Sequence, residues 1–263
     1  MNIRNADINA ENSLYEFCKK FGENNEACDF LLKHTEGDNI FIALDTEIKA
    51  VFFVCDKLVY KNKEGIFIYP VFDGKSPLLD NEIRAILDYI ENWYKKDFYI
   101  VKTNGFSDSS YSESMGYSPV KYRNFTYEIK KNIWQNADFD IVSASRFPTV
   151  RDKFRGEDIV HYTKPEYEKY ALYMYSTGGS TAENEHAYCV YFIKGDAIVV
   201  KEIFSENTTY AVKLLQAVRE RCGCEKAKII LSENSNLFLG EGVLEAAYYV
   251  KGLESPYVNL MFD

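Results

Sequence analysis

The chain has 263 residues, of which 46% are hydrophobic, so it is long enough to bury one large core or two small ones. Its formal net charge of −9 argues against nucleic acid as a partner, because binding to a phosphate backbone needs clustered lysine and arginine. The opening residues are polar and no apolar run is long enough to span a bilayer, so we expect a cytoplasmic protein without a membrane segment.

Cysteine and histidine do not form a metal-binding pattern. The cysteines stand at positions 18, 28, 55, 189, 222 and 224, without disulfide or ligand spacing, and are expected to be free thiols. Cys222 and Cys224 form C-G-C rather than C-x-x-C. Because His34, His161 and His186 are also far apart in sequence, we expect no metal.

The first half of the chain opens with helical patterns and continues with strands. Apolar residues at helical spacing predict short helices at 12–21 and 26–34. Strand-like runs follow at 39–44, 48–55 and 66–72, and their short connections favour an antiparallel meander. The run 66–72 is apolar and aromatic throughout, which is typical of a strand covered on both faces.

A loop joins this last strand to an amphipathic helix that reaches about residue 96. The apolar residues of the helix recur at i, i+3, i+4 and i+7, namely Ile83, Ile86, Leu87 and Ile90. Asp80 or Asn81 is the expected N-cap. Loops of this kind bind phosphates in α/β proteins, because the first N–H groups of a helix are unpaired and its dipole is positive there. The loop DGKSPLLDN (73–81) suits a phosphate poorly, since Lys75 is its only cation.

The second half repeats the order of the first. A strand at 98–102, a serine-rich segment ending in a short helix near Gly116, and a strand at 123–129 close the first half. We then expect a helix from Lys164, strands at 186–193 and 197–204, a helix at 209–221, a strand at 228–231, a helix at 242–249 and a strand at 257–262. The repeat predicts two copies of one α/β (α+β) domain, at 1–130 and 131–263, each a mixed, mostly antiparallel sheet flanked by helices.

This order of elements, with SYSESMGY at 110–117 and PYVNLMFD at 256–263, resembles the GNAT acyltransferases. The doubled arrangement is similar to the tandem-GNAT acetyltransferases related to the enhanced-intracellular-survival protein. The resemblance implies two tandem GNAT-like domains, acetyl-CoA as a substrate, and a small-molecule or peptide amine as the acceptor.

The resemblance also implies a place for the coenzyme. The strand before the central helix offers backbone groups to pantetheine, and an R-G-x-G-type loop holds the pyrophosphate. In this sequence the loop motif falls on 78–81, where the arginine and both glycines are absent. The candidate coenzyme-binding residues are Val71, Phe72, Lys75, Leu79, Asp80 and Asn81.

The general acid of many such enzymes is a tyrosine that protonates the leaving thiolate. Its position falls on Ser112, a weaker acid, and Tyr111 stands one residue earlier. The terminal carboxylate of Asp263 is a third candidate for acid–base catalysis. In the second copy, Glu202 lies inside an apolar strand and could be a base, but a partnered or edge-facing glutamate is favoured.

Two functions therefore stay open. The first is an N-acetyltransferase that moves an acetyl group from acetyl-CoA to an amine. The second is a non-catalytic tandem-GNAT scaffold that binds a ligand or a partner, because in both copies the loop before the helix lacks a phosphate cradle.

Overall fold

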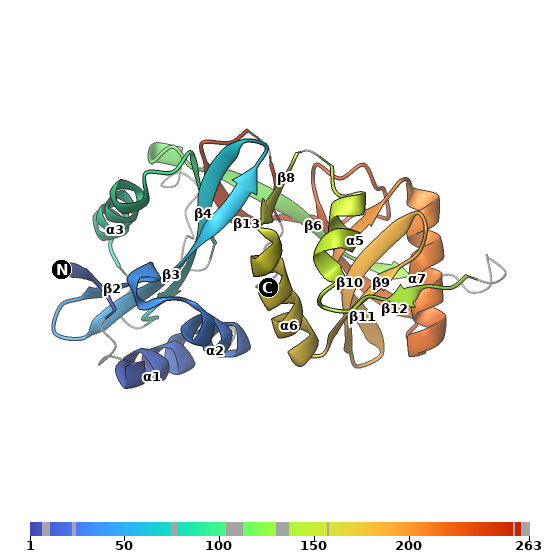
Figure 1. Ribbon diagram of the computed structural model, residues 1–263, viewed down its shortest axis with the longest axis horizontal. Coiled ribbons are helices and arrows are strands. Elements are labelled where there is room, and N and C mark those ends of the chain that lie inside the picture. Colours follow the sequence, from blue (N-terminus) through green and yellow to red (C-terminus); the bar gives the residue numbers. More distant parts are fainter. Residues whose placement is uncertain are drawn as a thin grey trace. The chain divides into compact units, whose positions relative to one another are not determined.

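The structure, a computed structural model, describes residues 1–6, 11–22, 25–74, 78–103, 113–129, 137–156, 158–254 and 256–258. Among these residues the chain forms two compact units (Figure 1). The first contains residues up to 120 together with 247–254, and the second contains residues 121–246 together with 256–258. The chain therefore passes from the first unit to the second within strand β6 (Ser118–Glu128) and returns within β13 (Val243–Lys251).

The first unit is a mixed sheet with helices on both faces. Its strands are β1 (Asn2–Asn5), β2 (Ile40–Leu44), β3 (Ile48–Tyr60), β4 (Lys63–Phe72) and β5 (Phe98–Lys102). They lie in the order β1-β2-β3-β4-β5-β13, in which β4 and β5 run parallel and the other pairs run antiparallel. Its helices are α1 (Glu11–Phe21), α2 (Asn25–His34), the 3-10 turn Gly37–Asn39 and α3 (Asp80–Tyr94).

The central strand of this unit is covered on both faces, as its apolar run predicts. Ile66 and Ile68 face α3 and pack with its buried stripe of isoleucine and leucine side chains. Phe67 and Tyr69 point to the opposite face and are buried as well. Helix α1 contacts β3 and β4. The strand thus forms the middle of a three-layer arrangement.

The second unit repeats this plan. Its sheet has the order β6-β12-β11-β10-β9-β7, and β8 pairs with β14. The strands are β7 (Asp140–Ile141), β8 (Ile159–Tyr162), β9 (Gly179–Glu183), β10 (Ala187–Lys194), β11 (Ala197–Ser205), β12 (Lys226–Ser232) and β14 (Tyr257–Val258). The helices are α5 (Phe147–Phe154), α6 (Lys164–Ser176) and α7 (Thr208–Cys222).

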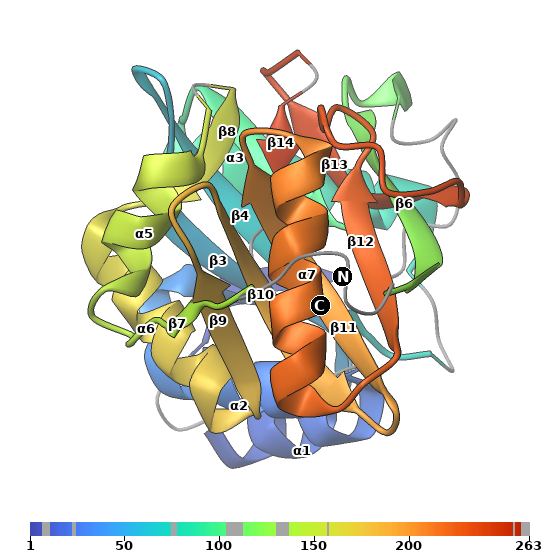
Figure 2. The same ribbon diagram turned by 90° about the vertical axis from the view of Figure 1, so that its right-hand side faces the viewer.

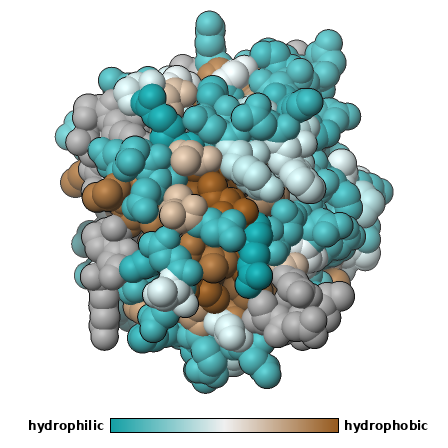
Figure 3. Space-filling model, turned by 90° about the vertical axis from the view of Figure 1, so that its left-hand side faces the viewer, coloured by the Kyte–Doolittle hydropathy of each residue, from teal (hydrophilic) through white to brown (hydrophobic). Residues whose placement is uncertain are grey.

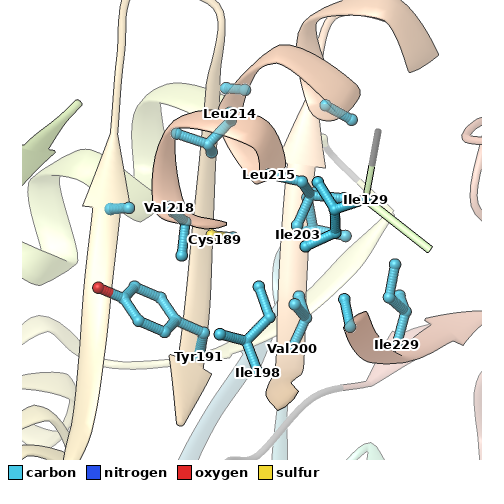
Figure 4. Packing of buried hydrophobic residues seen from close by; sticks show 14 of the residues in the cluster. Ile129, Cys189, Tyr191, Ile198, Val200, Ile203, Leu214, Leu215, Val218 and Ile229 are labelled. Atoms are coloured by element: carbon cyan, nitrogen blue, oxygen red, sulfur yellow. The ribbon is translucent and has the colours of Figure 1, made fainter. Parts of the chain in front are cut away.

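Helix α7 crosses one face of this sheet (Figure 2). Leu214, Leu215 and Val218 of α7 point at the strand side chains below them, and the whole cluster is buried (Figure 4). The strand residues include Ile198 and Val200 of β11, which alternate along one face of the strand. An amphipathic helix on a β-branched sheet face is the packing that the two periodicities predict.

Both units contain the same strand–helix–strand piece. In each, a strand leads into a helix and the following strand returns parallel to the first: β4-α3-β5 and β11-α7-β12. The predicted α/β fold class, with a mostly antiparallel sheet flanked by helices, is confirmed. The expected helix at 242–249 is wrong, because this segment is strand β13, whose residues from Tyr248 to Lys251 pair with β5. Helix α5 and strands β1, β7, β8 and β9 were not expected.

Candidate functional site

Strands β4 and β5 separate in the middle of the first unit. Their parallel pairing runs only from Gly65 opposite Phe98 to Ile68 opposite Val101. Beyond that point β4 continues for four residues to Phe72, while β5 continues for one, to Lys102. β4 stays paired with β3 as far as Phe72. The edge of β4 that faces β5 therefore carries backbone groups outside the β4–β5 ladder, and such an edge can receive an extended, amide-containing ligand.

Val71 and Phe72 lie on this separated part of β4. Val71 is buried, and Phe72 is half-buried with its ring edge-on to Phe52, at 5.7 Å between ring centres. These are the two residues for which the resemblance implies pantetheine contacts, and that role stays a prediction. We call the gap between β4 residues 69–72 and the end of β5 the β4–β5 split.

The helix that follows the split begins with its own carboxylate cap. The helix starts at Asp80 with Leu79 as N-cap, which corrects the expectation of Asp80 or Asn81 in that role. The Leu79 N–H donates to the Glu82 carboxylate at 2.8 Å, and the N–H groups of Glu82 and Ile83 donate to the Leu79 carbonyl. Because a leucine side chain cannot accept a hydrogen bond, this is half of a capping box.

This cap weakens the ability of the start of α3 to bind an anion. The Glu82 carboxylate takes a backbone donor at the positive end of the helix dipole, where a phosphate would otherwise bind. Asp80 and Asn81 are exposed in the first turn, and Leu79 is 65% exposed. The start of α3 therefore does not fit a pyrophosphate.

A groove of about 950 Å³ opens at the same end of the sheet. Antiparallel pairing places the end of β2, the start of β3 and the end of β4 together, and Asp73 follows β4 directly. The floor of the groove includes the apolar residues Phe17, Ile42 and Leu44. Its charged residues carry both signs: Arg4, Lys19, Lys20, Glu16, Glu47 and Asp73. Figure 3 shows the side of the first unit that carries α1 and β2, where apolar surface is exposed near the centre within a hydrophilic surround.

A second cavity, of about 540 Å³, lies between α1, α2 and the start of β2. Leu14, Leu32 and Ile40 give it apolar walls, and Asp29 and Lys33 give it one charge of each sign. Ile40, at the start of β2, pairs with Phe53 of β3, which pairs with Tyr69 of β4.

The second unit has a comparable split. The pairing of β11 with β12 ends at Val200 opposite Ile229, while β11 runs on to Ser205. A bulge at this point leaves Lys201 as the extra residue of β11, because Val190 pairs with Glu202 and Tyr191 with Val200. Burial, together with the nearby charge of Lys194, lowers the pKa of Lys201 to about 8.

Glu202, next to the bulge, is held by an arginine. Arg151 of α5 donates to both oxygens of Glu202, each at 2.9 Å, and also to the hydroxyl of Tyr167 in α6. The side chains of Arg151 and Glu202 are fully buried. Burial raises the pKa of Glu202 and Arg151 opposes that rise. The expectation of a partnered glutamate is confirmed.

The partner itself could have been found in the sequence. In FPTVRDKF, the residues Phe147, Val150, Arg151 and Phe154 recur at i, i+3, i+4 and i+7. Arg151 therefore stands on the apolar stripe of a helix, and a buried arginine needs an acid. That helix was not expected, so the signal was missed.

The start of α7 is also satisfied within the chain. The Asn207 side chain is the N-cap and accepts from the Tyr210 N–H at 3.1 Å. His186 stacks on the Tyr210 ring at 4.1 Å and pairs through Nδ1 with Glu206 at 3.0 Å. As in α3, a side chain of the protein occupies a donor that a phosphate would need.

Four predicted site residues lie outside the described residues: Lys75, Tyr111, Ser112 and Asp263. The described part of the chain brings Val71 and Phe72 to the β4–β5 split, and places Leu79, Asp80 and Asn81 at the start of α3. The same part contains no group of three or more His, Cys, Asp or Glu residues that could hold a metal ion. None of its helices is long and apolar enough to cross a membrane.

Solved structures similar to this one include GCN5-related N-acetyltransferases. One from Kribbella flavida has a TM-score of 0.64 at 11% identity, over 95% of this chain and 70% of that one. Eis1 from Mycobacterium abscessus has a TM-score of 0.65 at 9% identity, and the match covers 95% of this chain and 73% of Eis1. A putative acetyltransferase from Pyrococcus horikoshii has a TM-score of 0.62 at 11% identity, and the match covers 98% of this chain and 92% of that protein.

Comparison with models of protein families and with curated proteins finds no match for the sequence. At identities this low, the structural likeness shows the fold alone. The chain therefore has the fold of the GCN5-related N-acetyltransferases, and the predicted resemblance to that fold is confirmed.

Proposed function

We propose that the chain is an N-acyltransferase that moves an acetyl group from acetyl-CoA to an amine, with the thioester arm in the β4–β5 split. The observation that carries the proposal is the end of the β4–β5 ladder at Ile68 and Val101, four residues before β4 itself ends. The backbone edge of β4 near Val71 and Phe72 would bind the amides of pantetheine. An N–H of the same edge would polarise the thioester carbonyl.

The acceptor would reach the thioester from the groove at the same end of the sheet. The groove carries three acids and three bases, so its overall charge does not select the acceptor, and Asp73, directly after β4, would be the carboxylate that attracts a cationic small-molecule or peptide amine. The amine nitrogen loses a proton and bonds to the carbonyl carbon, the C–S bond breaks, and the thiolate takes up a proton. Tyr111, Ser112 and Asp263 stay the predicted sources of that proton.

The binding of the coenzyme pyrophosphate would differ from what the family resemblance implies. Lys75, Leu79, Asp80 and Asn81 stay predicted contacts, but the Glu82 cap leaves the start of α3 unsuited to the pyrophosphate. We therefore expect S-acetylpantetheine, which lacks the phosphates, to bind within about threefold of acetyl-CoA. A pyrophosphate held by two charge-assisted hydrogen bonds would instead favour acetyl-CoA by roughly two decades or more.

The same cap favours a second candidate function, a non-catalytic scaffold that binds a ligand or a partner. In this case the split and the groove would be remnants of an acyltransferase fold, and both helix starts would be closed by Glu82 and Asn207. The cytoplasmic location and the lack of a nucleic-acid partner stay predictions from the sequence.

Calorimetric titration with acetyl-CoA separates the two functions. Binding with a micromolar dissociation constant, together with thiol release when a panel of primary amines and lysine peptides is added, supports the acyltransferase. No heat of binding at millimolar acetyl-CoA and millimolar S-acetylpantetheine rejects it and leaves the scaffold. The control ligand is 3′,5′-ADP, which carries phosphates and adenosine but has no pantetheine arm to lie along β4.

A further inference from the structure

Two cysteines face each other between the first two helices. Cys18 lies in the last turns of α1, and Cys28 lies in the first turns of α2. Their side chains form a thiol–thiol hydrogen bond. Cys18 is 0% exposed and Cys28 is 1% exposed, and both are free thiols.

Gly22 lets the two sulfur-bearing turns come together. Its N–H donates to the Cys18 carbonyl at 2.7 Å, which closes the end of α1. A Cβ placed on Gly22 would lie 2.5 Å from the Cys28 sulfur and 2.5 Å from the Cys18 carbonyl oxygen. Only glycine leaves room for Cys28 against the end of α1.

The hydrogen bond makes the two thiols unequal. It lowers the pKa of Cys28 and, with burial, raises the pKa of Cys18. Cys28 is therefore the sulfur that ionises first, and Cys18 keeps its proton. In thiol–disulfide exchange, the thiolate attacks and a neighbouring thiol resolves the mixed disulfide.

We propose that Cys18 and Cys28 form a reversible disulfide that fastens α1 to α2. A small disulfide such as glutathione disulfide supplies the oxidising equivalents. The Cys28 thiolate attacks it and releases one glutathione thiolate, and the Cys18 sulfur, after losing its proton, then attacks the mixed disulfide and releases the second. Two protein S–H bonds are lost and one S–S bond forms, while one glutathione disulfide becomes two glutathione molecules.

The disulfide would join two helices whose residues line both cavities of the first unit. Helix α1 lines the groove with Glu16 and Phe17, and α1 and α2 together line the smaller cavity with Leu14 and Leu32. A cross-link between the helices would hold these walls at a fixed spacing. Because both sulfurs are buried, oxidation would follow an opening of the helix pair and be slower than that of a thiol at the surface.

Peptide mapping of the oxidised full chain tests the proposal directly. Trypsin cuts after Arg4, Lys19, Lys20 and Lys33, so Cys18 and Cys28 fall in the separate peptides 5–19 and 21–33. After incubation with glutathione disulfide, we expect a disulfide-linked pair of these two peptides and a fall in free thiols from six to four. We also expect the melting temperature to rise by about 4–8 °C and to return after reduction.

Serine variants supply the matched controls. Cys18→Ser and Cys28→Ser should each abolish the linked pair and the rise in melting temperature, whereas Cys55→Ser should keep both. A linked pair that involves other cysteines, glutathione that stays on Cys28, or a linked pair without a rise in melting temperature would each overturn the proposal. Mapping of the unsubstituted chain decides the chemistry even where a serine variant does not fold.

Discussion

Arg151 and Glu202 form a fully buried ion pair joined by two hydrogen bonds of 2.9 Å each. The Arg151 guanidinium also lies 4.8 Å from the centre of the Tyr167 ring and donates to the hydroxyl of that tyrosine. One side chain thus ties α5 to α6 and to β11. The carboxylate beside the split of the second unit is occupied by this structural role.

We predict that Arg151→Met lowers the free energy of unfolding by about 3–5 kcal/mol, because it leaves the Glu202 charge buried without a partner. The double variant Arg151→Met, Glu202→Met removes both charges and should recover most of that loss. Urea unfolding of the two variants and the unsubstituted chain measures both effects. A double variant that is no more stable than Arg151→Met would contradict this account of the pair.

The carboxylate cap of α3 gives a prediction about ligand affinity. Glu82→Gln keeps an oxygen that can accept from the Leu79 N–H and removes one negative charge from the helix start. We expect acetyl-CoA to bind about two- to fivefold more tightly to Glu82→Gln, while the affinity for S-acetylpantetheine stays the same. Calorimetry with both ligands measures the change.

Asp88→Asn is the matched control for the cap, because Asp88 is an exposed acid two turns along the same helix. It makes the same change in net charge at a position away from the helix start. An equal gain in affinity from Asp88→Asn would show that overall charge, and not the cap, opposes the phosphates.

Lys201 gives a prediction about pH. Its folded pKa of about 8 lies below the unfolded value of about 10.4, so between these values the unfolded chain holds more protons. The Lys201 contribution to stability therefore rises with pH in this window and is at its least favourable below pH 8. We expect the unsubstituted chain to gain about 1–2 kcal/mol relative to Lys201→Met between about pH 7.5 and 9.5.

The readout is the difference between the two proteins at each pH. Burial raises the pKa of the Cys189 thiol to about 12, and the hydrogen bond with Cys28 together with burial raises that of Cys18, so these groups lower stability as pH rises, in both proteins alike. Urea unfolding under reducing conditions at several pH values supplies the difference. A constant difference across the range would show that Lys201 keeps an ordinary pKa.

Periodicity predicted the elements whose packing is decided locally. The apolar run 66–72 and the stripe beginning at Ile83 became β4 and α3 at nearly the expected bounds. The segment 242–249 was misjudged because Leu244, Glu245 and the alanines favour helix, whereas pairing with β5, far away in sequence, makes it a strand. The pairing of β13 with β5 depends on residues far apart in sequence, so it cannot be predicted from local composition.

The candidate site was predictable only where it depends on residues that are close together in sequence. The position of Val71 and Phe72 follows from the strand before a helix, but the end of the β4–β5 ladder depends on two segments about 30 residues apart. The N-cap was expected at Asp80 or Asn81 from side-chain preference. The helix begins at Asp80, one or two residues earlier than those caps would place it, because the Glu82 carboxylate reaches back to Leu79 and replaces a side-chain cap.

Helices α3 and α7 end in the same backbone conformation but with different residue types, and this difference gives a prediction about stability. Both end in a left-handed residue, which is Lys95 after α3, with φ 49° and ψ 51°, and Gly223 after α7, with φ 70° and ψ 14°. A residue with a Cβ is strained in this conformation, and glycine is not. Lys95 is exposed, so its side chain contributes little packing to offset the strain.

Lys95→Gly should therefore raise the free energy of unfolding by about 0.5–1 kcal/mol, and Gly223→Ala should lower it by about 1–2 kcal/mol. A Cβ on Gly223 would meet no heavy atom within 4 Å, so the cost of Gly223→Ala would come from the backbone and not from a clash. Urea unfolding of both variants measures the pair of opposite shifts. Two shifts of the same sign would mean that side-chain contacts, and not the left-handed backbone, set the stability of these helix ends.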